Sequence, residues 1–417
     1  MKKLYQKIKN KVAKKEVKIL IENFFSLSFL KIVTMLLPLV ILPHLAKVLT
    51  IDLVGVLVLV TAIMGYAGTI IDYGFSYTGV RAIANTEKNI SKNTEIFLEV
   101  TCAKLILILT CFLFFMTIYF LTPWFKEYLI LFVFSFINVA LLSLSPDWFF
   151  QGIEKMRIIA IGEVIGKLIS FFLIILLVEQ KQDYILVPVF YALGQLFSLL
   201  IYIFFISEHI EISKIREISL NRIVLRFKEG WSVFLNILFP NLYNSYSYLA
   251  VGYFAGTAQV AIYDIARRFL SVSEILITVL SRVFFPSISR NIINHKIYIR
   301  LILYVALMLC LMQVSAAFFA IDFLFPISYQ ASKTVLLWQS LSPIVYALMT
   351  GYGLNYLIPL GKDIELRDIT IRSSIVGFFI VTMLTYQYGA VGAALGVSFT
   401  WALRAILCYR AYMLFKY

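Results

Sequence analysis

Ionisable residues recur at helical spacing inside an apolar stretch near residues 264–286. At 100° per residue, its polar side chains share one face of about 120°: Asp264, Arg267, Arg268, Ser271, Glu274, Thr278 and Arg282. A charge at the centre of a bilayer costs at least ~2.5 to 3.5 kcal/mol, so such residues are functional candidates by default. Guanidinium groups on this face could bind an anionic group, and the carboxylates could bind a proton or a cation.

Three further apolar stretches carry polar residues on one face. Residues 231–254 place Asn236 and Asn244 together, residues 22–46 contain Lys31, and residues 54–79 contain Asp72. We predict that these faces and the 264–286 face line a polar, cation-containing cavity. Two alternatives stay open: helix packing through small residues, and buried ion pairs at Lys31 and Arg268.

Other intramembrane charges have simpler interpretations. Glu163 and Lys167 are four residues apart and are expected to neutralise each other. Arg81, Arg282 and Arg404 lie near the ends of apolar stretches, where long side chains can reach the headgroups.

No arrangement typical of an enzyme or a metal site is evident. The three histidines are scattered, and the four cysteines have no metal-ligand spacing. No glycine-rich phosphate loop of P-loop spacing occurs. We therefore expect no enzymatic activity, no metal and no cofactor apart from a coupling ion, H⁺ or Na⁺. The best candidate for the coupling site is Glu274, which shares its helix face with Arg267.

The elements that position these residues follow from composition. Of 417 residues 61% are hydrophobic and 14% are charged, which excludes a soluble globule. A membrane helix needs about 20 apolar residues, so about 12 spans fit. We place them at 22–46, 54–79, 97–121, 127–145, 158–178, 184–206, 231–254, 264–286, 298–320, 334–358, 369–387 and 390–414.

Basic residues predict the orientation of these spans. If the N-terminus is cytoplasmic, the cytoplasmic ends carry 26 Lys and Arg and the opposite ends carry four. This asymmetry places both termini in the cytoplasm. We predict that residues 1–18 form a basic amphipathic segment. A basic linker, 207–230, is predicted to separate an N-lobe, 19–206, from a C-lobe, 231–417. The predicted fold is thus an all-α polytopic membrane protein with two six-helix lobes around a central cavity.

One motif resembles a known family. Between the fourth and fifth spans the sequence reads Pro146-Asp147-Trp148-Phe149-Phe150-Gln151-Gly152-Ile153-Glu154-Lys155-Met156. This string is similar to the signature of the Wzx-type O-antigen and capsular repeat-unit flippases, in the polysaccharide transport branch of the MOP superfamily. The stretches 72–84, 259–268 and 388–393 resemble the family's pattern in the same order.

The resemblance implies a V-shaped carrier in the bacterial cytoplasmic (inner) membrane. By alternating access it would turn undecaprenyl-diphosphate-linked oligosaccharide repeat units toward the periplasm, for the biosynthesis of O-antigen, capsule or other exopolysaccharide. Lys31, Arg267 and Arg268 would then bind the diphosphate. Expected partners are this lipid, membrane lipid and other polysaccharide-assembly membrane proteins, and no nucleic acid. Trp148, Phe149 and Phe150 suit an interfacial aromatic belt, with Asp147, Glu154 and Lys155 in headgroup water.

Two other functions stay open. A multidrug or organic-ion antiporter of the same superfamily would favour a cavity dominated by carboxylates. A membrane-embedded polysaccharide polymerase or ligase would carry large periplasmic loops, whereas every predicted outer loop here is short.

Overall fold

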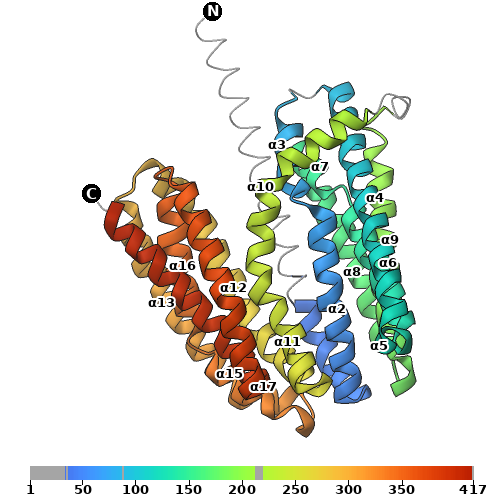
Figure 1. Cartoon of the computed structure of the whole chain (residues 1–417), viewed down its shortest axis with the longest axis vertical. Coiled ribbons are helices and arrows are strands. Elements are labelled where there is room, and N and C mark those ends of the chain that lie inside the picture. Colours follow the sequence, from blue (N-terminus) through green and yellow to red (C-terminus); the bar gives the residue numbers. More distant parts are fainter. Residues whose placement is uncertain (1–32, 34–35, 87–88, 212–218, 416–417) are drawn as a thin grey trace, which may run out of the picture. The chain divides into compact units, whose positions relative to one another are not determined.

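The computed structural model describes residue 33 and residues 36–86, 89–211 and 219–415. Its regular elements are all helical in this part of the chain. After a helix over Leu36–Val48 the α-helices follow in order (Figure 1): α2 (Ile51–Asp72), α3 (Phe75–Ala84), α4 (Ile90–Leu121), α5 (Pro123–Glu127), α6 (Leu129–Leu144), α7 (Asp147–Gly152), α8 (Met156–Leu177), α9 (Leu186–Ile206), α10 (Leu220–Asn244), α11 (Tyr246–Ala255), α12 (Thr257–Arg290), α13 (Asn294–Ser315), α14 (Ile321–Leu324), α15 (Ala331–Trp338), α16 (Ser342–Tyr352) and α17 (Asp363–Phe415).

Among the described residues, eight helical segments are long and apolar enough to cross a membrane. Three other predicted spans correspond to α10 with α11, to α15 with α16, and to the second part of α17. Of the predicted span 22–46, the end from residue 36 lies in the helix Leu36–Val48, and residues 22–32, 34 and 35 lie outside the described residues. The predicted all-α polytopic fold is confirmed. The cytoplasmic location of both termini stays a prediction.

Gly389 divides the long helix α17 into two. Its backbone is non-helical, with φ of 55° and ψ of −132°, a left-handed conformation that glycine adopts without a steric penalty. Three residues later, a Cβ atom on Gly392 would lie 1.8 Å from the carbonyl oxygen of Leu384. The break falls between the predicted spans 369–387 and 390–414, so the two parts of α17 supply one span each.

The chain forms two compact units. Within the described residues, the first contains 36–41, 67–179 and 185–234, and the second contains 42–66, 180–184 and 235–415. Helices α2 and α10 therefore each contribute to both units. The lobe boundaries expected from the sequence stay a prediction.

Small residues let α8 and α9 approach closely within the first unit (Figure 1). A Cβ atom on Gly166 would lie 2.4 Å from the carbonyl oxygen of Gly194. Ser198 donates a hydrogen bond to the Gly162 carbonyl at 2.9 Å, and Ser170 donates to the Phe190 carbonyl at 3.0 Å. Close backbones joined by hydroxyl groups are a common way to pair helices in lipid, where burial from water contributes little.

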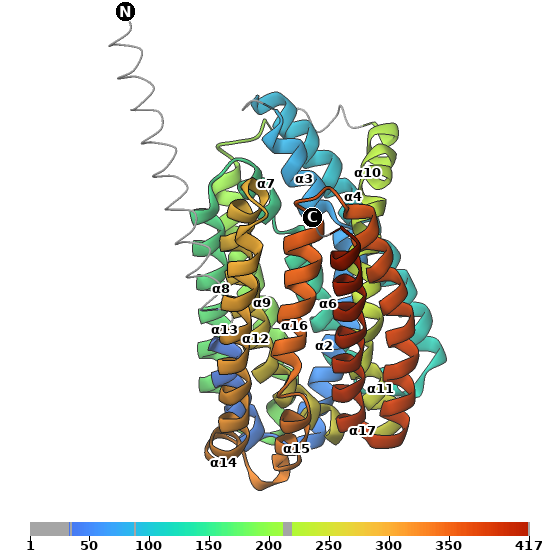
Figure 2. The ribbon, with the colours of Figure 1, turned by 90° about the vertical axis from the view of Figure 1, so that its left-hand side faces the viewer.

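In the second unit, α12 packs beside α13 and α16 (Figure 2). Their contact is a buried apolar cluster that includes Ile277 from α12, Tyr298 and Ile302 from α13, and Ala347 from α16. This packing holds one side of α12 in place and so fixes where its polar face points.

The N-terminal part of α10 lies inside the predicted linker 207–230, because the helix begins at Leu220. Arg222 donates to the Glu95 carboxylate at 2.6 Å, and Arg226 donates to Glu99 at 2.9 Å. Hydrogen bonding to Glu95 and Glu99 raises the pKa of the Arg222 guanidinium above its ordinary value. These bonds to α4 explain why a basic stretch is helical.

Candidate functional site

Two ion pairs occupy the polar face of α12. Arg268 donates from Nε to Asp264 Oδ2 at 2.6 Å, one helical turn apart. Arg267 Nη1 lies 3.0 Å from Glu274 Oε1, two turns apart. The side chains of Arg267 and Glu274 are only 12% and 23% exposed. The helical period thus brings four of the predicted site residues together on one helix.

Residues of α17 complete the surroundings of Arg267. Its guanidinium carbon lies 5.4 Å from the centre of the Trp401 ring, a distance typical of a cation–π contact. Arg404 lies one turn further along α17 and is half-buried; the sequence left open whether its side chain reaches the headgroups. Its Nε atom is buried, and its charge acts on the Tyr346 hydroxyl, as that of Glu274 does.

Several donors of this cluster have no acceptor among the residues that the structure describes. Arg267 Nε and Nη1 and Arg404 Nε are buried without a hydrogen-bond partner there. The Arg267–Glu274 pair is therefore close enough for attraction but not aligned as a hydrogen bond. Buried unsatisfied guanidinium donors are costly. They are suited to an anionic ligand with several oxygen atoms.

Tyrosines from α11 and α16 surround the same face. Tyr248 donates to Asp264 Oδ1 at 3.3 Å, and the hydroxyl groups of Thr278 and Tyr346 are 3.2 Å apart. Thr278 also donates to the Glu274 carbonyl at 2.7 Å. Four helices, α11, α12, α16 and α17, therefore contribute polar groups to the site. Its three arginines, Arg404 included, exceed its two carboxylates by one positive charge.

The remaining predicted site residues of α10 and α12 are dispersed. Asn244 has a buried Oδ1 without a hydrogen-bond partner among the described residues, whereas Asn236 and Arg282 are exposed. No hydrogen bond or ion pair among the described residues joins these three to the Arg267 cluster. Lys31 lies outside the described residues.

Asp72 belongs to a different cluster, in the first unit. Its Oδ1 atom is 3.5 Å from Lys104 Nζ and accepts a hydrogen bond from Ser76 at 2.5 Å. Lys104, on α4, is 3% exposed and donates to the Ser143 carbonyl at 2.8 Å. Lys104 was not among the site residues predicted from the sequence, although a lysine in the middle of an apolar span is itself a signal.

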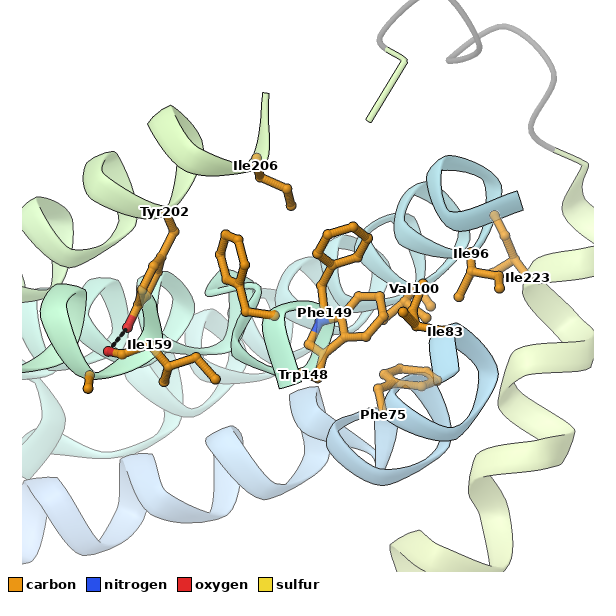
Figure 3. Packing of buried hydrophobic residues seen from close by; sticks show 13 residues of the cluster. Phe75, Ile83, Ile96, Val100, Trp148, Phe149, Ile159, Tyr202, Ile206 and Ile223 are labelled. Carbon is orange, nitrogen blue, oxygen red and sulfur yellow. Dashed lines mark hydrogen bonds between the residues drawn. The ribbon is translucent and has the colours of Figure 1, made fainter. Parts of the chain in front are cut away.

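The signature motif forms part of the protein core (Figure 3). Trp148 is 4% exposed, Phe149 and Phe150 are fully buried, and they pack with Phe75 and Ile83 of α3. The expected interfacial aromatic belt is therefore wrong. Short helix α7 turns these rings inward, where glycines make room for them: a Cβ atom on Gly79 would lie 2.5 Å from the Trp148 ring.

The polar residues of the motif divide into two groups. Gln151, Glu154 and Lys155 are exposed, in agreement with the prediction for the last two. Asp147 is half-buried, and its Oδ1 atom is buried without a hydrogen-bond partner among the described residues, so this oxygen is not in headgroup water. Pro146, before α7, and Gly152, at its end, are buried. A Cβ atom on Gly152 would lie 2.7 Å from Ile83.

Comparison with known proteins gives one family and two named relatives. A family model described as "Polysaccharide biosynthesis protein" matches residues 20–292. A Shigella dysenteriae protein is 26% identical over 389 residues, covering 90% of this chain and 96% of its own length. An Escherichia coli K12 protein is 24% identical over 370 residues, covering 86% and 88%. Both carry the name "Putative O-antigen transporter".

Solved structures show the same fold. An inward-facing multidrug resistance MATE family transporter of the MOP superfamily has a TM-score of 0.71 at 15% identity, covering 91% of this chain and 94% of its own. The lipid II flippase MurJ, in an inward closed conformation, also has a TM-score of 0.71, at 13% identity and with coverage of 94% and 87%. At these identities the likeness concerns the fold alone.

Proposed function

This chain belongs to the polysaccharide biosynthesis protein family, and from that membership we propose that it flips a lipid-linked oligosaccharide across the bacterial cytoplasmic membrane. The substrate is an undecaprenyl-diphosphate-linked repeat unit, and transport proceeds by alternating access. Two relatives named as O-antigen transporters cover most of the chain, and a lipid II flippase is among the proteins with this fold.

The observation that carries the proposal is the set of buried guanidinium donors near α12. A diphosphate offers several oxygen acceptors and negative charge, which match Arg267 Nε, Arg267 Nη1 and Arg404 Nε. Arg267 is already held over the Trp401 ring, so little side-chain freedom is lost when a ligand binds. The lipid tail stays in the bilayer throughout.

The antiporter alternative differs from this proposal in the sign of the charge on its substrate. The fold does not separate the two functions, because a multidrug transporter matches it as well as a flippase does. The charges near α12 favour an anion: Arg267, Arg268 and Arg404 face Asp264 and Glu274. An organic cation would meet an excess of positive charge.

Reconstitution tests the proposal directly. Purified full-length chain in liposomes receives a fluorescent undecaprenyl-diphosphate oligosaccharide, and a membrane-impermeant quencher reports how much probe reaches each leaflet. We expect wild type to equilibrate the probe and Arg404→Met to slow it at least tenfold. Arg300→Met, which removes an exposed arginine of α13, is the matched control and should retain the wild-type rate.

Two outcomes would refute this function. One is wild-type protein that leaves the probe in its original leaflet while transporting a fluorescent organic cation. The other is an Arg404→Met rate equal to that of Arg300→Met, which would exclude the guanidinium donors from the substrate site. The coupling ion is a separate question, for which the sequence predicts Glu274.

A further inference from the structure

A buried asparagine outside the charged cluster contacts α12 at a single residue. Asn355 is fully buried in a short π-helix, η5 (Gly353–Leu357), which follows α16. The Ser281 hydroxyl of α12 donates to Asn355 Oδ1 at 2.6 Å, and Asn355 Nδ2 donates to the Ser281 carbonyl at 3.0 Å. Ser281 is itself 1% exposed. One residue of α12 therefore pairs with both polar atoms of the buried amide.

The position of Asn355 is held by α17. The two residues that follow Asn355 in η5 pack with Ile369 and Cys408 of α17 in one buried cluster. A Cβ atom on Gly353 would lie 3.1 Å from Cys408 Sγ, so η5 and α17 are in close contact. Helix α16, which leads into η5, also lies beside α17 (Figure 2). Asn355 thus joins α12 to the helix that carries Trp401.

Ser281 lies in line with the charged pair of the candidate site. Arg267, Glu274 and Ser281 follow one another at intervals of seven residues. Seven residues are close to two helical turns, so the direction of the side chain changes by only about 20° per step. A contact that holds Ser281 against η5 therefore also sets the direction in which Arg267 and Glu274 point.

Other contacts of α12 define this rotation less well. The apolar cluster around Ile277 determines which side of α12 is buried, but apolar attraction has no preferred direction. Gln313 of α13 donates to the Ser273 hydroxyl at 3.0 Å, and its Oε1 atom has no hydrogen-bond partner among the described residues. A single bond to a hydroxyl group permits the helix to turn. The Ser281 carbonyl belongs to the helix backbone, so the bond from Asn355 restrains the backbone itself.

The backbone around Asn355 is also unusual. A π-helix is rare and occurs mostly as a single turn, frequently at functional sites. Here the π-helical turn and the buried amide fall in the same five residues. Helices in lipid can pack through apolar and small residues alone. A buried polar side chain on an irregular turn therefore indicates a role beyond packing.

We propose that Asn355 is a positioning residue for transport. Through Ser281 it sets the rotation of α12 at which Arg267 lies over the Trp401 ring and the unpaired Arg267 donors are presented to the substrate. Without Asn355, α12 turns about its axis and the guanidinium leaves the ring. The effect on transport rests on the proposed function, whereas the effect on Trp401 does not.

Fluorine NMR measures the position of Arg267 without any substrate. Full-length chain labelled with fluorotryptophan in lipid nanodiscs gives one resonance for each of the five tryptophans, and the resonance that is lost in Trp401→Phe belongs to Trp401. Arg267→Met should shift this resonance, because it removes the cation from the ring. Asn355→Leu should shift it in the same direction. Ser281→Ala, which keeps the bond to the carbonyl, should shift it in that direction by a smaller amount.

Ser198→Ala is the matched control. Ser198 is as buried as Ser281, and its hydroxyl also joins two helices, α8 and α9 of the first unit. This variant should leave the Trp401 resonance at its wild-type position, and an equal shift in Ser198→Ala would overturn the proposal. So would a wild-type Trp401 resonance in whichever of Asn355→Leu and Ser281→Ala elutes as folded protein. Ser281→Ala removes a single oxygen atom and so tests the contact even where Asn355→Leu does not fold.

The liposome assay tests the role in transport. Asn355→Leu should slow flipping of the lipid-linked probe at least tenfold, because a small displacement of a binding group is costly, and Ser198→Ala should retain the wild-type rate. A shifted Trp401 resonance with an unchanged flipping rate in Asn355→Leu would overturn this role. Absence of flipping in wild type, with the resonance shifted in the variants, would instead refute the proposed function and leave the positioning of α12 intact.

Discussion

The Arg267–Glu274 pair offers the sharpest test of whether the α12 charges bind substrate or only stabilise the fold. Both side chains are largely buried and their charged atoms are 3.0 Å apart. At an effective dielectric constant of 20, two unit charges at this separation attract by about 5.5 kcal/mol. That figure sets the order of magnitude of the coupling between the two residues.

A double-mutant cycle with Arg267→Met and Glu274→Met measures this coupling. Each single variant leaves one buried charge unpaired and should lower the free energy of unfolding by about 3 kcal/mol, the low end for buried pairs because Glu274 keeps 23% exposure. The double variant buries no unpaired charge and should return to within about 1 kcal/mol of wild type. The assay is reversible unfolding in mixed micelles, followed by tryptophan fluorescence.

In this cycle we expect the flipping rate and the free energy of unfolding to respond differently. The double variant is expected to fold and yet lose flipping at least tenfold, because the Arg267 donors are absent. The partly exposed pair Lys333 and Asp322, 2.5 Å apart near α15, is the matched control; its double variant should retain flipping, and its coupling should be much smaller. Recovery of both stability and flipping in the double variant of Arg267→Met with Glu274→Met would show that this pair is structural.

Three other predictions address the rest of the chain. Reporter fusions should place loops near residues 90, 150, 218, 294 and 365 in the cytoplasm and those near 50, 180 and 326 outside, from the bias of Lys and Arg; a periplasmic 207–230 loop would contradict the two-lobe organisation. Lys31→Ala and Arg268→Ala should each abolish surface-polysaccharide export without lowering the abundance of the protein, and Lys31→Arg should retain part of the export. A lower abundance of the Arg268→Ala protein would show instead that Arg268 stabilises the fold through its pair with Asp264. Trp148→Ala should lower the free energy of unfolding by about 3 to 5 kcal/mol because the ring is in the core; an unchanged unfolding transition would restore the interfacial belt.

Periodicity and composition were sufficient to predict where the helices lie and which residues share a face of one helix. The apolar stretches correspond to the helical segments, and the break between the last two spans coincides with Gly389. The pair Glu163–Lys167 was predicted because residues four apart share a helix face. Asp264 and Arg268 were placed on one face for the same reason, although the sequence did not name them as a pair. The motif at 146–156 likewise indicated the family through its order of residues alone.

Contacts between helices were decided by the tertiary structure. Lys104 meets Asp72, Trp401 lies against Arg267, and Trp148 is buried rather than at the membrane interface. An apolar face looks the same in sequence whether it meets lipid or another helix, because lipid tails are as apolar as leucine. Which faces meet depends on how closely small residues such as Gly79 and Gly166 let neighbouring elements approach. That distance depends on two segments at once, and neither segment specifies it alone.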